Sequence, residues 1–282
     1  MTISKRFFAD RSERGKLRFT GPQRAWFLHQ ILTQSFEDIQ PGEERDAALL
    51  TPNGRMIGYL EACATDEAIF CHFEVSLNDT LPDAIRKYVL ATDVRIDDVT
   101  QEMGLVLVGG PGWRDAELDI DGVHVLQASR AVGVDAAYVW TQRDEVGGLM
   151  DRLESRGFEA ASEEELEASR IDAGVPRWGF EMNEKTIPQE AGIDDWAVHY
   201  SKGCYVGQEA MAKIHFRGKP NRRLAQLQGD SDLQPGADVL VEGKKIGAVT
   251  SAAGTKALAI VRYDVEAGAA VQIDDALVQV VA

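Results

Sequence analysis

A single cysteine in a polar, glycine-flanked segment is the residue of this chain best placed for chemistry. Cys204 lies in the octapeptide KGCYVGQE at residues 202–209, two positions after Lys202. The flanking glycines let the backbone approach a ligand closely, and a helix beginning at Gln208 would direct its positive end at the sulfur. We therefore expect Cys204 and Lys202 to be catalytic. The alternative is a small buried hydrophobic residue, as free cysteines often are.

Basic residues cluster just after this thiol in an otherwise acidic protein. After Glu209 the chain has no acidic residue as far as Arg223. The cations of this run are Lys213, Arg217, Lys219, Arg222 and Arg223, with His215 among them. Such a run predicts a site for an anionic ligand, and the alternative is a solvated loop.

Charge and composition restrict which partners the protein is expected to bind and where in the cell it is expected to act. The 282 residues carry a formal net charge of −16, and a field of this sign disfavours nonspecific binding to nucleic acid or anionic membranes. No run of about eighteen apolar residues occurs, and the N-terminus lacks a signal-peptide core. Three cysteines without CxxC spacing predict neither a disulfide framework nor a zinc site. We expect a cytoplasmic protein.

The first hundred residues predict a mixed, antiparallel α+β arrangement. Pro22 and Pro82 each precede apolar residues at helical spacing, and Asn53-Gly54 supplies the positive φ that a tight hairpin turn requires. The expected elements are a strand at 16–19, a helix from Pro22, hairpin strands at 46–51 and 56–62, and a helix following Pro82.

The remaining chain predicts more α+β structure and then only short strands. Strands are expected at 105–108, 123–126 and 137–141, a helix at 146–153, and a helix opened by a capping box at 162–165. From residue 224 five or six strands follow without a helix, which predicts a small barrel or sandwich. We therefore divide the chain into residues 1–220 and a C-terminal β-barrel domain at 221–282.

A second polar motif, RIDAGVPRWGFE at residues 170–181, lies upstream of the thiol. Arg170 and Asp172 close a helix and face opposite ways unless the chain unwinds there, which the following glycine and Pro176 favour. Unwinding would offer one cation and one carboxylate to a single pocket. The alternative is a helix end with an ordinary ion pair.

Together the two motifs resemble the family of the glycine-cleavage T-protein, an aminomethyltransferase, and the cysteine octapeptide is similar to its YgfZ-type, folate-binding branch. The resemblance implies a three-lobed fold around a central folate channel, with tetrahydrofolate as cofactor. It also implies that Asp172 contacts the pterin ring, although aspartate is shorter than the family's usual glutamate. The expected folate-binding residues are Arg170, Asp172, Trp178, Tyr205, Gln208, Glu209, Lys213 and Arg217.

One departure from the T-protein pattern shapes the functional hypotheses. The T-protein carries a catalytic aspartate after a glycine in its first lobe, whereas residues 54–59 here contain no carboxylate. Loss of such a group typically removes about 3 kcal/mol of transition-state stabilisation. The leading hypothesis is a folate-binding accessory protein for iron-sulfur cluster assembly or repair, with Cys204 as nucleophile, redox thiol or cluster ligand, and with iron-sulfur client or assembly proteins as partners.

Two other functions fit parts of the pattern. Arg170, Asp172 and the fold resemblance favour a tetrahydrofolate-dependent aminomethyltransferase or demethylase. A cysteine hydrolase would use His199 or His215 as base, because both lie near Cys204 in sequence.

Overall fold

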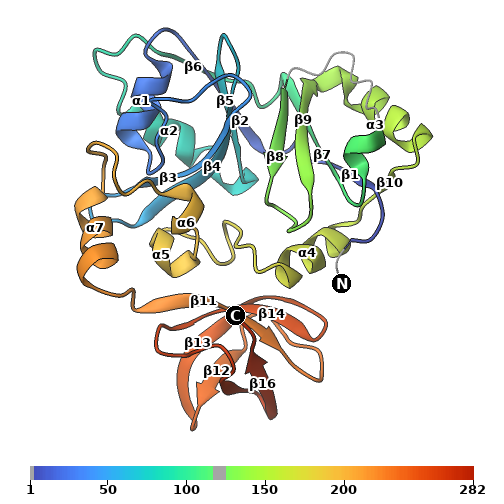
Figure 1. Ribbon diagram of the computed structural model, residues 1–282, viewed down its shortest axis with the longest axis vertical. Coiled ribbons are helices and arrows are strands. Elements are labelled where there is room, and N and C mark those ends of the chain that lie inside the picture. Colours follow the sequence, from blue (N-terminus) through green and yellow to red (C-terminus); the bar gives the residue numbers. More distant parts are fainter. Residues whose placement is uncertain (1–2, 117–124) are drawn as a thin grey trace.

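Three lobes surround a central region in the computed structural model, which describes residues 3–116 and 125–282 (Figure 1). Two lobes each contain a five-stranded sheet with helices, and the third is a closed barrel. The predicted α+β class with a C-terminal all-β barrel is therefore confirmed. None of the helices in the described parts is long and apolar enough to span a membrane.

The first lobe is an antiparallel sheet of strand order β3-β4-β5-β2-β6 with two helices. Its elements are β2 (Gly15–Thr20), α1 (Arg24–Ile31), β3 (Glu44–Leu50), β4 (Met56–Ala64), β5 (Ile69–Phe73), a 3-10 turn at Val75–Leu77, α2 (Thr80–Arg86) and β6 (Arg95–Asp98). Two expected boundaries were wrong. The helix placed at Pro22 begins at Arg24, and α2 contains Pro82 in its first turn, where proline has no intrahelical N–H bond to lose.

The hairpin of β3 and β4 forms as predicted and positions part of the site. Gly54 adopts a φ of +78°, and the Thr51 N–H donates to the Arg55 carbonyl at 2.8 Å. The strands pair with Asp46 directly opposite Glu61. Residues opposite one another in an antiparallel pair point to the same face, so these two carboxyl side chains are neighbours.

The second lobe is a sheet of order β10-β1-β7-β9-β8, in which only β1 and β10 are parallel. Because β1 precedes the whole first lobe in sequence, the two lobes are intertwined. The elements are β1 (Phe7–Asp10), β7 (Met103–Gly109), a 3-10 turn at Trp113–Ala116, β8 (Val125–Ser129), β9 (Ala136–Gln142), a 3-10 turn at Arg143–Glu145, α3 (Val146–Ser155), β10 (Glu159–Ala160) and α4 (Glu163–Asp172).

Local signals in this lobe are mostly confirmed. Ser162 caps α4 in a capping box with Glu165, as expected. The strand expected at 123–126 falls partly on residues 117–124, which lie outside the described residues, and β8 is described from Val125.

Three short helices lead from α4 to the barrel (Figure 1). They are α5 (Pro188–Ala191), α6 (Asp194–Ala197) and α7 (Gln208–Arg217), and α7 starts after Gly207, whose φ is +84°. A side chain at Gly207 would approach the Thr51 carbonyl to 2.6 Å. This glycine therefore allows the cysteine octapeptide to pack against the β3-β4 hairpin.

The third lobe is a closed six-stranded barrel of order β11-β14-β13-β12-β15-β16, filled by its own apolar core. Its strands are β11 (Arg222–Gln228), β12 (Asp238–Val241), β13 (Lys244–Ala253), β14 (Lys256–Arg262), β15 (Ala270–Ile273) and β16 (Ala276–Val280). Strands β13 and β14 face α4, and β11 faces α5. The barrel thus supports the segment that carries the second polar motif.

Candidate functional site

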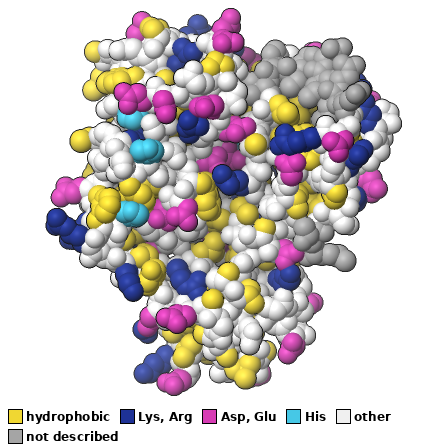
Figure 2. Space-filling view, viewed as in Figure 1, with side chains coloured by type: hydrophobic (Ala, Val, Ile, Leu, Met, Phe, Trp, Pro, Cys, Tyr) yellow, Lys and Arg dark blue, Asp and Glu magenta, His cyan; other side chains and the backbone are white. Residues whose placement is uncertain are grey.

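A cavity opens where the two sheet lobes face each other beside α4. It holds about 820 Å³ of space free of protein atoms, including the part open to solvent. Acidic and basic side chains gather in this hollow (Figure 2). Its lining includes Arg11, Arg14, Tyr59, Glu61, Glu74, Arg130, Tyr138, Glu167, Arg170, Arg177, Trp178 and Trp196.

At one end of the cavity Arg14, in the turn before β2, is buried among three acceptors. Its Nε donates to Nδ1 of His72 at 2.9 Å, and its two terminal nitrogens donate to Glu61 at 3.0 Å and Glu74 at 2.5 Å. Since an arginine does not lose its proton, His72 must accept at Nδ1 and is neutral. Burial, with help from the Arg14 charge, lowers the pKa of His72 well below its usual value.

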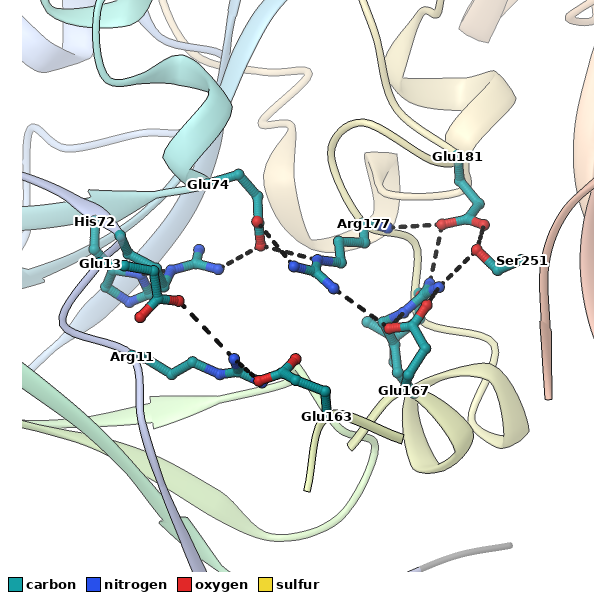
Figure 3. Close-up of polar contacts among 12 residues, drawn as sticks. Arg11, Glu13, His72, Glu74, Glu163, Glu167, Arg177, Glu181 and Ser251 are labelled. Carbon is teal, nitrogen blue, oxygen red and sulfur yellow. Dashed lines mark hydrogen bonds and ion pairs between the residues drawn. The ribbon is translucent and has the colours of Figure 1, made fainter. Parts of the chain in front are cut away.

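Arg177 continues the network from the first lobe toward α4 (Figure 3). Its Nε and Nη2 both donate to Glu74 at 3.3 Å, and its Nη1 lies 3.5 Å from Glu167. Burial alone would raise the pKa of Glu74, but Arg14 and Arg177 outweigh it and lower that pKa. Glu74 is therefore an ionised link between two arginines.

Arg170 lines the cavity, but its hydrogen-bonding capacity is fully used. Its Nε and Nη2 bind the Glu167 carboxylate, its Nη1 donates to the Val175 carbonyl and to Glu181, and its Nη2 also donates to Ser251. An arginine has five N–H donors, so none remains for a ligand. We expected Arg170 to bind folate directly, but in the structure its guanidinium instead holds the wall of the cavity together.

Glu181 connects that wall to the barrel. Its side chain is fully buried; one oxygen accepts from Thr250 at 2.7 Å and Ser251 at 2.6 Å, and the other from Arg170 and the Arg177 backbone N–H. Both hydroxyls belong to β13. The barrel therefore fixes the carboxylate that orients the two arginines.

Tyr59 of β4 lines the cavity and hydrogen-bonds to two residues of an adjoining one. Its hydroxyl donates to Asp46 at 3.0 Å and accepts from the Trp196 indole at 3.3 Å. The Arg130 Nε lies 3.8 Å from Asp46, and its guanidinium lies over the Trp196 ring. Asp46, Arg130 and Trp196 also line the second cavity, with Glu44, Arg45 and Asp135.

Lys202 is buried, and its amine is directed at the end of a helix. Its Nζ donates to the backbone carbonyls of His29, Leu32 and Gln34 at the C-terminus of α1. Burial lowers the pKa of Lys202 to about 7, while three acceptors match the three N–H donors of the ammonium form. The structure therefore gives this predicted catalytic lysine a helix-capping role.

The Cys204 thiol is on the surface, unlike Cys63 and Cys71, which are buried. Among the described residues no side chain is hydrogen-bonded to it, so His199 and His215 form no dyad with it. The ring of His215 stacks on Tyr200, with centroids 3.6 Å apart. The hydrolase hypothesis thus gains no geometric support.

The rest of the octapeptide and the basic residues of α7 lie outside the described lining of the cavity. Tyr205 is buried in the first-lobe core with its ring 4.9 Å from the Lys202 amine, and the Gln208 amide donates to the Lys202 carbonyl. Glu209, Lys213 and Arg217 are exposed on α7. None of these residues, nor Cys204, is among the described residues that line either cavity.

Asp172 and Trp178, both expected to bind folate, are separated by the structure. Asp172 pairs with Lys256 of β14 and is not among the cavity-lining residues described. Trp178 lines the cavity from the segment after α4. Helix α4 continues through Asp172 instead of unwinding, so Arg170 and Asp172 face different surroundings.

Sequence reasoning missed most of the cavity. Arg14, Glu61, Glu74 and Arg177 come from distant segments, and only their combination forms a site. One signal was present: Glu61 is a charged residue within the otherwise apolar end of β4. A carboxylate in a buried strand requires a partner or a function.

Among the described residues, no group of three or more histidine, cysteine or acidic side chains is placed to hold a metal ion.

Comparison with known proteins gives the fold an independent context. Residues 221–282 match the family described as the C-terminal β-barrel domain of CAF17. A protein of Arabidopsis thaliana, described as a candidate chloroplast transferase, is 27% identical over 88% of this chain, which spans 62% of that protein's length. The aminomethyltransferase of Rubrobacter xylanophilus is 27% identical over 86% of this chain and 70% of its own.

Among solved structures, the glycine-cleavage aminomethyltransferase T of Bartonella henselae superimposes with a TM-score of 0.87 at 19% identity, covering 100% of this chain and 86% of that one. The chain therefore has the three-lobed aminomethyltransferase fold. The structural likeness shows the fold, and the family match covers the barrel lobe.

Proposed function

We propose that this chain is a YgfZ-type protein that binds tetrahydrofolate in the central cavity and uses Cys204 in iron-sulfur cluster assembly or repair. The observation that carries the folate part is the cavity itself. It lies between the two sheet lobes, beside α4, in an aminomethyltransferase fold, and it combines aromatic, carboxyl and guanidinium groups in one space.

The described lining fits the chemistry of a reduced folate. Trp178 and the partly exposed Trp196 line the cavity and offer aromatic surface to the pterin and aminobenzoyl rings. Glu61 offers a carboxyl group to the N–H donors of the aminopyrimidine edge. Arg130, two-thirds exposed at the cavity wall, offers a cation for the glutamate tail in place of the basic residues of α7. Tetrahydrofolate would supply nitrogens that carry a one-carbon unit.

Titration calorimetry with tetrahydrofolate tests this assignment. We expect wild type to bind, Arg130→Ala to bind about tenfold more weakly through loss of about 1.4 kcal/mol, and Lys213→Ala to bind like wild type. The Lys213 variant is the matched control because it removes a cation outside the cavity. No binding by wild type would refute the proposal that the protein binds folate. An equal loss of affinity in the two variants would refute the placement of folate in the central cavity.

Exposure of Cys204 supports its proposed contact with a client protein or with iron-sulfur cargo. In cells lacking the protein, we expect Cys204→Ser to fail to restore iron-sulfur enzyme activity although it binds folate normally. Ser201→Ala, a substitution of an exposed neighbour, should restore activity in full. Equal rescue by both variants would remove the thiol from the mechanism. We infer a cytoplasmic location, since all three cysteines are free thiols.

A tetrahydrofolate-dependent aminomethyltransferase or demethylase is the second candidate. One observation favours it: although residues 54–59 contain no carboxylate, Asp46 and Glu61 place two beside Tyr59. Incubation of purified protein with tetrahydrofolate and methylated amines or glycine-cleavage intermediates should then yield methylene-tetrahydrofolate. Absence of product from a folate-binding sample would exclude turnover with these donors.

A further inference from the structure

We propose that Asp46 and Glu61 form an acid–base pair that holds one proton at neutral pH and exchanges it with a basic nitrogen of the ligand in the central cavity. This inference rests on the proposed folate binding for its ligand, but the pair itself is a property of the free protein.

Strand pairing brings the two carboxyl groups together. Asp46 of β3 is directly opposite Glu61 of β4, so both side chains leave the sheet on the same face. Tyr59, two residues before Glu61, points to this face as well and donates its hydroxyl proton to Asp46 at 3.0 Å. Like charges in this position are unfavourable, which makes retention of a proton the lower-energy solution.

The charges around the pair leave it short of cations. Arg14 faces Glu61 at 3.0 Å but is shared with Glu74. Arg130 lies 3.8 Å from Asp46 and is mostly exposed. The other titratable groups that bear on the pair are Glu44, Tyr138 and the neutral His72. Arg177 also pairs with Glu74, but Asp46 has only the mostly exposed Arg130 as a cation within 4 Å among the described residues.

Burial raises the pKa of both members of the pair. For Glu61 the Arg14 charge opposes this rise, whereas repulsion from Asp46 and Glu74 adds to it. For Asp46 the Tyr59 hydrogen bond and Arg130 oppose it, and Glu44 adds to it. Electrostatics and geometry therefore agree that the pair keeps a proton.

The pair is positioned where a ligand would meet it. Glu61 and Tyr59 line the central cavity, Asp46 lines the second, and Arg130 and Trp196 line both. A nitrogen between the two cavities would face the proton. In the forward step the carboxyl O–H bond breaks and an N–H bond forms on the nitrogen lone pair. The electron pair stays on the carboxylate, which Arg14 or Tyr59 stabilises, and the reverse step restores the acid.

Carbon NMR of the free protein, labelled at the side-chain carboxyls, tests the pair directly. We expect at least one of the two groups to titrate above the ordinary range of side-chain carboxyl groups, and Asp46→Asn to lower the Glu61 midpoint by removing repulsion. Glu67, an exposed residue outside the described lining of both cavities, provides the control. Glu67→Gln should leave both signals unchanged. Ordinary midpoints for Asp46 and Glu61 alike would overturn the proposal.

Calorimetry in buffers of different ionisation enthalpy then measures the protons exchanged when tetrahydrofolate binds at pH 7. We expect a fraction of one proton per site for wild type and Glu67→Gln, and close to none for Glu61→Gln. Asp46→Asn serves as second variant if Glu61→Gln fails to fold, and should also change the count. Binding with the same proton count in all variants would refute the exchange, whereas absent binding would refute only its folate ligand.

Discussion

In the central cavity, buried and partly exposed arginine and glutamate side chains pair with one another in an unbroken series from Arg14 to Glu181. On α7, Lys213 and Arg217 are exposed and form no ion pair with any described residue, and Cys204 beside them is equally open. Charged side chains are thus paired with one another in the cavity but unpaired and exposed on α7. Where water is excluded an unpaired charge is costly, so the charged side chains of the cavity pair with one another. Where water remains, charges and the thiol stay available to a partner.

The largest expected effect is from Arg170→Ala. Removing this guanidinium leaves the fully buried Glu181 without its charged partner and leaves the partly exposed Glu167 with Arg177 alone, so we expect a loss of about 3–5 kcal/mol in the free energy of unfolding. Urea denaturation measures it. Arg217→Ala, an exposed arginine on α7, should change the free energy by less than about 0.5 kcal/mol. Similar losses from both would abolish the contrast between the two regions.

A smaller loss is expected from Lys202→Met, which keeps the aliphatic stem. The three carbonyls at and just after the end of α1 would lose their donor, at an expected cost of about 1–3 kcal/mol in the free energy of unfolding. Thermal and urea unfolding provide the measurement. Unchanged stability, together with slower alkylation of Cys204, would restore the lysine to its predicted role beside the thiol.

The pH dependence of stability tests whether the pKa of Glu61 in the cavity is raised. The pKa of Glu61 is raised in the folded state. The stabilisation that protonated Glu61 gives the folded state is therefore fully present below its unfolded-state pKa, near 4.3, and is lost as pH rises through its folded-state pKa. Each unit by which the folded-state pKa exceeds the unfolded-state pKa corresponds to about 1.4 kcal/mol in the free energy of unfolding. We expect wild type to lose stability relative to Glu61→Gln between pH 5 and 9, as followed by urea unfolding in that range. Parallel curves would contradict a raised pKa.

The smallest effect on stability belongs to Cys204→Ser, which should shift the free energy of unfolding by less than about 0.5 kcal/mol. The main effect of this substitution is expected on the reaction of the protein with thiol reagents. A thiol reagent should modify one group per native chain rapidly, since Cys63 and Cys71 are buried and burial raises the pKa of both. Mass spectrometry identifies the modified residue, and rapid labelling of Cys63 or Cys71 would show that the core opens.

Local features of the fold were predictable because they depend on neighbouring residues. The Asn53-Gly54 turn, the Ser162 capping box, the start of α7 at Gln208 and the run of barrel strands all follow from short-range backbone preferences. The predictions for helix starts at Pro22 and Pro82 failed by a few residues, because Pro22 lies just before α1 whereas Pro82 lies within the first turn of α2. Proline is accepted anywhere in a first helical turn, so it marks a helix start only approximately.

The sequence by itself determined the fold class, the barrel and the presence of a cysteine segment suited to chemistry. The tertiary structure alone decided which side chains share a space. It directed Lys202 to α1, Asp172 to Lys256, and Arg14, Glu61, Glu74 and Arg177 into one cavity. The physical reason is that ion pairs and buried carboxyl groups depend on distance and exclusion of water, which are set by strand pairing and lobe packing between residues far apart in the chain.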